Sequence, residues 1–231
     1  MTLPPAGAEP GTAAEQERGI WLTGAHDRTD LATFAERALR LDDAAVIRLR
    51  TRSSSSLIAW VATGFDVLAS RVVNGRVKPA DLSAGADALA RGLAAGVGAG
   101  YVDPGFAMDS AWHGVLPPES GFVHLDDVPV WVMLELADRG VELAREHGSA
   151  HGPPVSLLEQ DVVEVSSGDL TVGVPMRCVF ALTGMGFLPQ SAQDVPEDEI
   201  VRVRASPTWL RIDARFGSVY RRRGDPSVVL R

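Results

Sequence analysis

Residues 200–220 read IVRVRASPTWLRIDARFGSVY, and they contain two stretches of strict alternation separated by a turn. The apolar positions on one side are Val201, Val203, Leu210, Ile212, Ala214 and Phe216. The opposite side carries Arg202, Arg204, Trp209, Arg211 and Arg215. A period of two on both sides of a turn containing Ser206–Pro207 predicts an antiparallel β-hairpin with one buried face.

The outward face of this hairpin is basic. With a four-residue loop, the expected register places Arg202 opposite Arg211 and Arg204 beside Trp209. Like charges directly opposite each other destabilise a sheet, so an anion across this face is a reasonable expectation. The alternative is a solvated edge whose charges discourage aggregation.

The charge of the chain is divided unevenly. Residues 200–231 contain eight arginines against Asp213 and Asp225, which gives a net charge of +6. Because the whole chain has a net charge of −8, the other 199 residues have a net charge of −14. A basic end on an acidic body can contact a polyanion, or it can dock on an acidic surface of its own chain or of a sister chain. Arg221, Arg222 and Arg223 extend the basic patch, and Trp209 could stack on a base or on an arginine.

Length and composition favour an ordinary globular protein. The chain has 231 residues, 45% of them hydrophobic and 23% charged, which is enough for one large or two small domains. The longest apolar runs, such as Val128–Leu134, are too short to cross a membrane, and no signal peptide is evident. The single cysteine, Cys178, excludes an internal disulfide and fits a reducing cytoplasm. Its apolar neighbours predict a buried, unreactive thiol.

Periodicity predicts an α+β layer in the first part of the chain. Helices are expected at about 30–40 and 83–94, and strands at 44–50, 57–62 and 65–73. The short turns between the strands favour an antiparallel meander, with both helices on one face of the sheet.

Beyond residue 95 the pattern changes. We expect a Gly/Pro-rich aromatic loop to about residue 126, a helix over 127–147, an apolar run at 155–165 that fits a helix or a strand, and a helix over 175–183. Followed by the basic hairpin, this order resembles a winged-helix module. The predicted organisation is a disordered tail at 1–19, an α+β domain at 20–95, the loop at 96–126, and a helix-plus-hairpin domain at 127–231.

The aromatic loop is the one stretch that suggests a small-ligand pocket. Tyr101, Asp109, Trp112 and His113 could supply aromatic walls and polar groups. The alternative is that Tyr101, Phe106 and Trp112 are mostly buried against a core. No nucleophile or phosphate-binding motif accompanies them. No cofactor or metal site is predicted, since Gly148 separates His147 from His151 and a third ligand is missing.

Six short motifs carry a resemblance to a known family. They are Leu41–Asp42, Arg48–Leu49–Arg50, Leu68–Ala69–Ser70–Arg71, Val115–Leu116–Pro117–Pro118, Met185–Gly186–Phe187 and Trp209–Leu210–Arg211. Over about residues 20–223 the chain resembles an actinobacterial family of conserved hypothetical proteins with two uncharacterised domains. The resemblance implies no particular activity.

Three functions remain open from the sequence. The first is a non-catalytic cytoplasmic protein that contacts nucleic acid or another polyanion through Arg202, Arg204, Trp209, Arg211, Arg215 and Arg221–Arg223. The second is a protein-interaction or homo-oligomerisation module whose hairpin docks on an acidic protein surface. The third is a small-ligand binder or enzyme that uses the 101–124 loop. The overall acidity argues against the first, and arginines already paired with carboxylates would favour the second.

Overall fold

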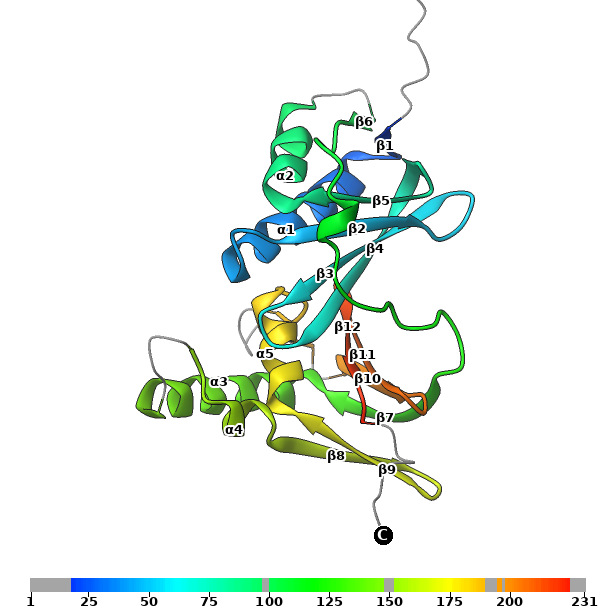
Figure 1. Ribbon diagram of the computed structural model, residues 1–231. Coiled ribbons are helices and arrows are strands. Elements are labelled where there is room, and N and C mark those ends of the chain that lie inside the picture. The colour runs from blue at the N-terminus through cyan, green and yellow to red at the C-terminus, as the bar shows by residue number, and fades with distance from the viewer. Residues whose placement is uncertain (1–17, 97–99, 148–151, 190–194, 197, 225–231) are drawn as a thin grey trace, which may run out of the picture.

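The computed structural model describes residues 18–96, 100–147, 152–189, 195–196 and 198–224 (Figure 1). Residues 1–17 of the predicted tail lie outside the described residues. The elements of the first half are β1 (Gly19–Leu22), α1 (Ala25–Leu41), β2 (Val46–Thr51), β3 (Ser56–Thr63), β4 (Val67–Lys78), β5 (Asp81–Gly85), α2 (Ala86–Ala95) and β6 (Tyr101–Val102). Those of the second half are a 3-10 turn (Asp109–Ala111), β7 (Val123–Pro129), α3 (Val130–His147), α4 (Val155–Leu158), β8 (Asp161–Ser167), β9 (Leu170–Pro175), α5 (Met176–Gly184), β10 (Ile200–Ala205), β11 (Trp209–Ala214) and β12 (Gly217–Arg222).

One antiparallel sheet joins the two halves of the chain. Its main path runs β5-β2-β3-β4-β12-β11-β10-β7, while β1 pairs with β4 and β6 pairs with β1. The two halves meet where β12 pairs with β4, with Ser218 opposite Ser70 and Tyr220 opposite Leu68. We call this pairing the junction.

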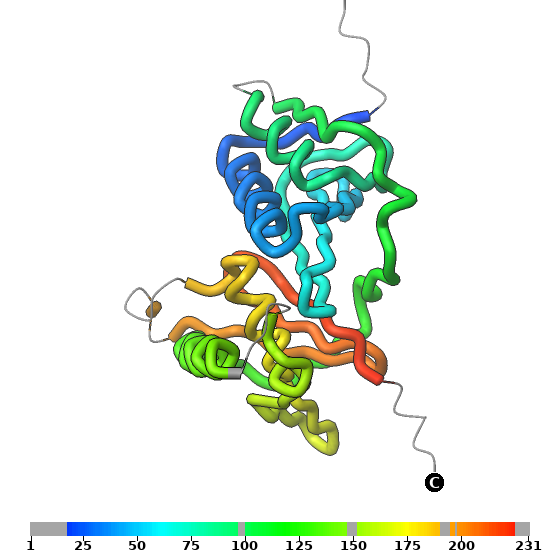
Figure 2. Tube along the Cα trace, turned by 60° about the vertical axis from the view of Figure 1, so that its left-hand side comes forward, coloured from blue at the N-terminus to red at the C-terminus, as the bar shows by residue number. Residues whose placement is uncertain are grey.

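The helices cover one face of this sheet. In Figures 1 and 2, α1, α2, α3 and α5 lie on one side of the molecule, and the connection over residues 103–122 runs along the opposite side. The helical stripe of α1 is buried on the sheet, with Leu31 and Phe34 at its centre. Phe34 stacks on Phe187 after α5, with ring centroids 6.3 Å apart, so the cores of the two halves are continuous.

The hairpin at 200–214 is confirmed. Strands β10 and β11 pair antiparallel, and Val201, Val203 and Ile212 are fully buried on the helix side. The expected register is wrong by two residues, because the partner of Arg202 is Asp213 and not Arg211. Ser206–Thr208 forms a tighter connection, in which Ser206 Oγ accepts from the Trp209 amide, so Arg204 lies opposite Arg211 and Arg202 opposite Asp213.

The winged-helix order of elements is wrong. The hairpin is not a terminal wing, because β12 pairs with β11 and β7 pairs with β10, which places the hairpin inside the large sheet. Residues 123–129 form a strand, although Asp127 and Pro129 are typical of a helix start. Helix α3 therefore begins at Val130, where the Val130 amide donates to the Glu199 carbonyl. The ambiguous run at 155–165 contains both a helix, α4, and a strand, β8.

Candidate ligand site at the junction of the two halves

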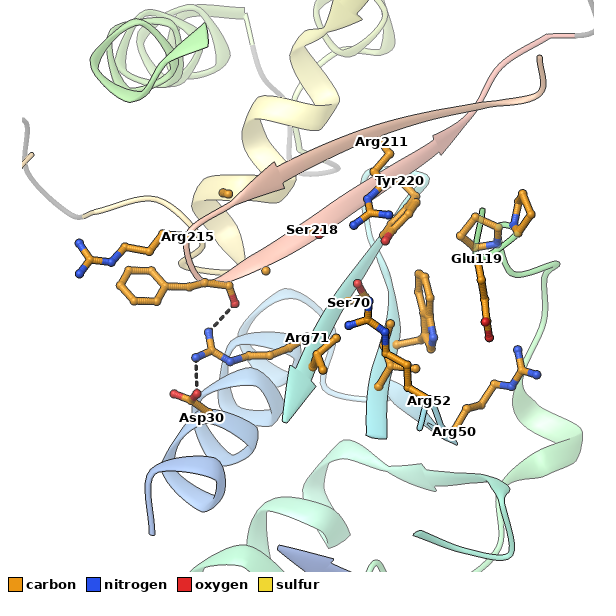
Figure 3. Close-up of a pocket in the computed structure, with 18 of the residues that line it drawn as sticks. Asp30, Arg50, Arg52, Ser70, Arg71, Glu119, Arg211, Arg215, Ser218 and Tyr220 are labelled. Atoms are coloured by element: carbon orange, nitrogen blue, oxygen red, sulfur yellow. Dashed lines mark hydrogen bonds and ion pairs between the residues drawn. The ribbon is translucent and has the colours of Figure 1, made fainter. Parts of the chain in front are cut away.

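A cavity of about 730 Å³ lies over the junction. We call it the outer cavity. Strands β3 and β4 form one wall, the turn between β11 and β12 forms another, and Pro117–Glu119 of the 103–122 connection closes a third side (Figure 3). The start of α1 reaches it through His26 and Asp30. Segments from three distant parts of the sequence thus build one site.

Aromatic side chains make the floor of the outer cavity. Trp60 and Tyr220 are buried with ring centroids 4.9 Å apart, and with Trp209 they form an apolar cluster separate from the main core. Phe122 packs edge-on against Tyr220 at 6.1 Å. Burial raises the pKa of the Tyr220 phenol above its ordinary value, because the phenolate would lose its hydration.

The charged residues around this floor are mostly arginines. Five arginines line the cavity, namely Arg50, Arg52, Arg71, Arg211 and Arg215, against the two carboxylates Asp30 and Glu119. The lining residues alone carry a formal charge of +3 with His26 neutral, and Asp81, Asp213 and Glu199 outside the lining pair with three of the arginines. A concave basic surface on an acidic protein attracts anionic groups locally.

Two of these arginines are held by carboxylates. Arg71 is mostly buried, pairs with Asp30 at 2.6 Å and donates to the carbonyl of Phe216. Arg211 donates to Asp213 at 2.7 Å, and its guanidinium lies 5.5 Å from the Tyr220 ring centroid. These contacts fix both guanidiniums in the wall of the cavity.

The other arginines are freer. Arg215 is 61% exposed, and its nearest carboxylate is Glu199 at 3.7 Å. Arg50 shares Asp81 with Arg48. The exposed side chain of Arg52 has no hydrogen bond or ion pair within the described residues. Arg52 and Arg215 are therefore the cations best able to meet a charged ligand.

The arginines predicted to bind nucleic acid do not form one open face. Both Arg204 and Arg211 pair with Asp213, while Arg202 is 3.7 Å from Asp127. Arg221 lies opposite the buried Leu210, on the helix side, and pairs with Glu159 at 2.6 Å.

The remaining members of that predicted site lie near the end of the hairpin. Arg222 is exposed opposite Trp209, and Arg223 donates to the Ser206 carbonyl at 3.0 Å. Trp209 is only 7% exposed within the aromatic cluster, which limits stacking on a base. A role of these residues in nucleic-acid binding stays a prediction.

Of the residues predicted for a loop pocket, Asp109 and Trp112 both lie near the guanidinium of Arg48. Tyr101 packs on Trp21, and Asp109 accepts the Ser83 amide at 2.6 Å. Trp112 packs against the aromatic cluster, while His113 is exposed. None of these four residues lines the outer cavity.

The expected burial of the loop aromatics is wrong for Phe106, which is 90% exposed. Tyr101 and Trp112 are half-buried. The loop is instead anchored through its later part, where Trp112, Leu116 and Phe122 pack on the aromatic cluster. His151, weighed as a metal ligand, lies outside the described residues.

Sequence reasoning named Arg211 and Arg215 as site residues but missed the other residues that build the outer cavity. Arg52, Trp60 and Arg71 come from β3, β4 and the turn before β3, and no motif connects them to Arg215 or Tyr220. The available signal was the outward alternation in β11, which placed Arg211 on the exposed side. It could not reveal that β4 lies two strands away.

Cys178 offers a direct check of the packing in this half of the chain. The side chain is 1% exposed, and burial raises the pKa of its thiol to about 12. We expect an aromatic disulfide reagent at about pH 8 to leave the native protein unlabelled and to titrate one thiol in urea, because only the thiolate reacts. The absorbance of the released thiolate measures both states. Rapid labelling of the native protein would contradict the buried position.

Comparisons with known proteins add two findings. A domain of unknown function (DUF8010) matches residues 15–114, and a second domain of unknown function (DUF8185) matches residues 117–226. These two matches to domains of unknown function indicate an uncharacterised family. Its actinobacterial source stays a prediction. No curated protein matches the sequence.

Solved structures with a similar fold are DNA polymerase sliding clamps. The clamp from Bacillus subtilis has a TM-score of 0.57 and 10% identity, covering 94% of this chain and 68% of that one. The Caulobacter crescentus clamp has a TM-score of 0.53 and 12% identity, covering 94% and 69%. A putative DNA polymerase III beta subunit from Eubacterium rectale has a TM-score of 0.54 and 9% identity, covering 89% and 64%.

This chain therefore spans about two thirds of the length of these clamps. At such low identity the likeness concerns the fold alone. It overturns the winged-helix order in favour of a sliding-clamp-like, sheet-rich architecture. None of the helices among the described residues has the length and apolar character needed to span a membrane.

Proposed function

We propose that this protein is a non-catalytic binding scaffold that holds an acidic segment of a partner protein in its outer cavity. The observation that carries the proposal is an aromatic floor bordered by five arginines, of which Arg52 has no ion pair within the described residues and Arg215 is 61% exposed. Trp60 and Tyr220 offer apolar contact area, while Arg52 and Arg215 offer charge near the surface. Buried aromatics ringed by charge are typical of protein-binding surfaces.

Protein contact is favoured over nucleic-acid contact by the pairing of the arginines. Phosphate binding needs several free arginines on one surface, but Arg204 and Arg211 share Asp213. The helices α1, α2, α3 and α5 together contain eight acidic and seven basic residues, so the helix side is not basic either. The clamp-like fold is consistent with a scaffold that binds without catalysis. A cytoplasmic setting and self-association remain parts of the proposal.

A charge-reversal experiment tests the outer cavity. The probe is the peptide Glu-Glu-Phe-Ile-Glu-Glu-amide with carboxyfluorescein in place of an acetyl group on its N-terminal amine, which combines carboxylates with an apolar centre. Arg52→Glu and Arg215→Glu should each raise its Kd by about tenfold or more in fluorescence anisotropy, because each removes an attraction and adds a repulsion. Higher salt should weaken binding to the unmodified protein.

The matched control is Arg91→Glu on α2, an exposed arginine that forms an (i, i+4) pair with Asp87. This variant has the same charge change at a site away from the outer cavity, and its Kd should stay within about twofold of the unmodified protein. A peptide with Gln in place of all four Glu should bind more weakly. No binding at peptide concentrations up to about 1 mM, or equal losses in all three variants, would overturn the proposed function.

A further inference from the structure

The edge of β4 that faces the outer cavity is interrupted. Two strands share this edge: β12 pairs with β4 as far as Ser218 opposite Ser70, and β1 pairs with it from Leu22 opposite Gly75. On the other edge, β3 pairs with β4 continuously from Thr63–Val67 to Ser56–Asn74. Residues 71–74 therefore have a partner strand on one side only, over a gap of roughly 13 Å.

The main chain of Val72 points into this gap. Asn74 sets the direction, because its amide donates to Asp27 Oδ1 at 2.8 Å and its carbonyl accepts from Thr23 at 3.2 Å, both away from β3. Peptide groups alternate along a strand, so the N–H and C=O of Val72 point the same way as those of Asn74. The ladder of β12 stops before Val72, and the contacts of Asn74 use its own peptide groups. Within the described residues, the backbone N–H and C=O of Val72 thus have no hydrogen-bond partner, and we call these two groups the free rung.

This rung opens on the outer cavity. Val72 lines the cavity and is 39% exposed. The back of the gap is closed on the helix side, where Arg71 bonds both to Asp30 and to the Phe216 carbonyl (Figure 3). An exposed strand edge with free N–H and C=O groups is a template for another extended chain.

We propose that the acidic segment bound in the outer cavity is extended and that its backbone forms hydrogen bonds with the N–H and C=O of Val72 on β4. The inference rests on the proposed function and specifies how the partner binds. Backbone bonds to Val72 would set the register of the segment, as in other cases of strand addition. An apolar side chain on the outer side would lie beside Val72 and Ile58, with carboxylates on either side of it near Arg52 and Arg215.

Hydrogen exchange of single amides tests this rung. In the free protein, the Val72 amide should exchange quickly. With saturating acetyl-Glu-Glu-Phe-Ile-Glu-Glu-amide, its exchange rate measured by NMR should fall by about tenfold or more, because a hydrogen-bonded amide exchanges only on opening. The Val73 amide, which points toward β3, is the internal control and should be slow in both states.

A second measurement changes only the backbone of the probe. N-methylation of either central residue, Phe or Ile, removes one backbone N–H donor from the peptide. Methylation of the N–H that bonds to the Val72 carbonyl should weaken binding by about tenfold. N-methylation of the first Glu should have little effect. The peptide could bind and respond to Arg52→Glu, yet leave Val72 exchange unchanged and tolerate both central N-methyl groups. That result would overturn the backbone pairing at Val72 and leave the proposed function standing. A peptide that does not bind at all would overturn both.

Discussion

Replacing Ile212 with aspartate is expected to lower the free energy of unfolding by about 4 kcal/mol or more. Ile212 is fully buried on the helix side of β11, opposite Val203 and Val219. Aspartate would leave a cavity and would also bring a carboxylate without a partner into the main core. Because β11 lies inside the large sheet, the loss should affect both of its neighbouring strands. Urea unfolding followed by tryptophan fluorescence measures the change.

Ile212→Val is the matched control for this experiment. It removes one methylene at the same place and keeps the β-branched shape, so a loss of only about 0.5–1.5 kcal/mol is expected. An aspartate variant as stable as the valine variant would mean that position 212 is open to water. That result would contradict the inward face of the hairpin.

Replacing Arg177 with alanine is expected to cost about 3 kcal/mol. Arg177 is 5% exposed on α5 and donates to the Phe65 carbonyl at 2.8 Å, beside Asp66 at 3.4 Å. Its other nitrogen pairs with Glu159, whose second oxygen binds Arg221. The side chain therefore connects α5 and α4 with the turn before β4, which belongs to the first half of the chain.

Its loss should leave the Phe65 carbonyl without its donor and a hole between the halves. The control is Arg139→Ala on α3, whose partner Glu135 is half exposed and whose own side chain is 67% exposed. That change should cost less than about 0.5 kcal/mol, because water screens the pair. Equal unfolding midpoints for the two variants would show that the Arg177 network contributes no net stability.

The local elements were predictable because their signals are local. The helix at 30–40 and the strands at 44–50, 57–62 and 65–73 correspond to α1, β2, β3 and β4. Apolar periodicity identified them, since it records which side of a helix or strand is buried. Strand β7 escaped prediction because Asp127 and Pro129 suit a helix start as well as the protected edge of a sheet.

For Trp209 the sequence predicted the correct face of the strand but the wrong surroundings of the side chain. Alternation placed it on the outward face with Arg211, and it does lie there. The face is nevertheless covered, because Trp112, Leu116 and Phe122 of the 103–122 connection pack on the aromatic cluster to which Trp209 belongs. A period of two distinguishes the two faces of a strand, but it does not say what lies over the second one.

The sequence by itself determined the elements, the inward face of the hairpin and the division into a basic C-terminal segment and an acidic body. Only the tertiary structure decided that β12 joins β4, and this pairing creates the outer cavity and the gap at Val72. It also decided which arginines are neutralised, since Arg204, Arg211 and Arg221 meet Asp213 and Glu159 only after folding. The reason is physical: periodicity reports which side of a helix or strand is buried. Strand order depends on segments more than a hundred residues apart, such as β4 and β12, being packed on one core, and the pairing of Arg204 with Asp213 depends on the register of the hairpin.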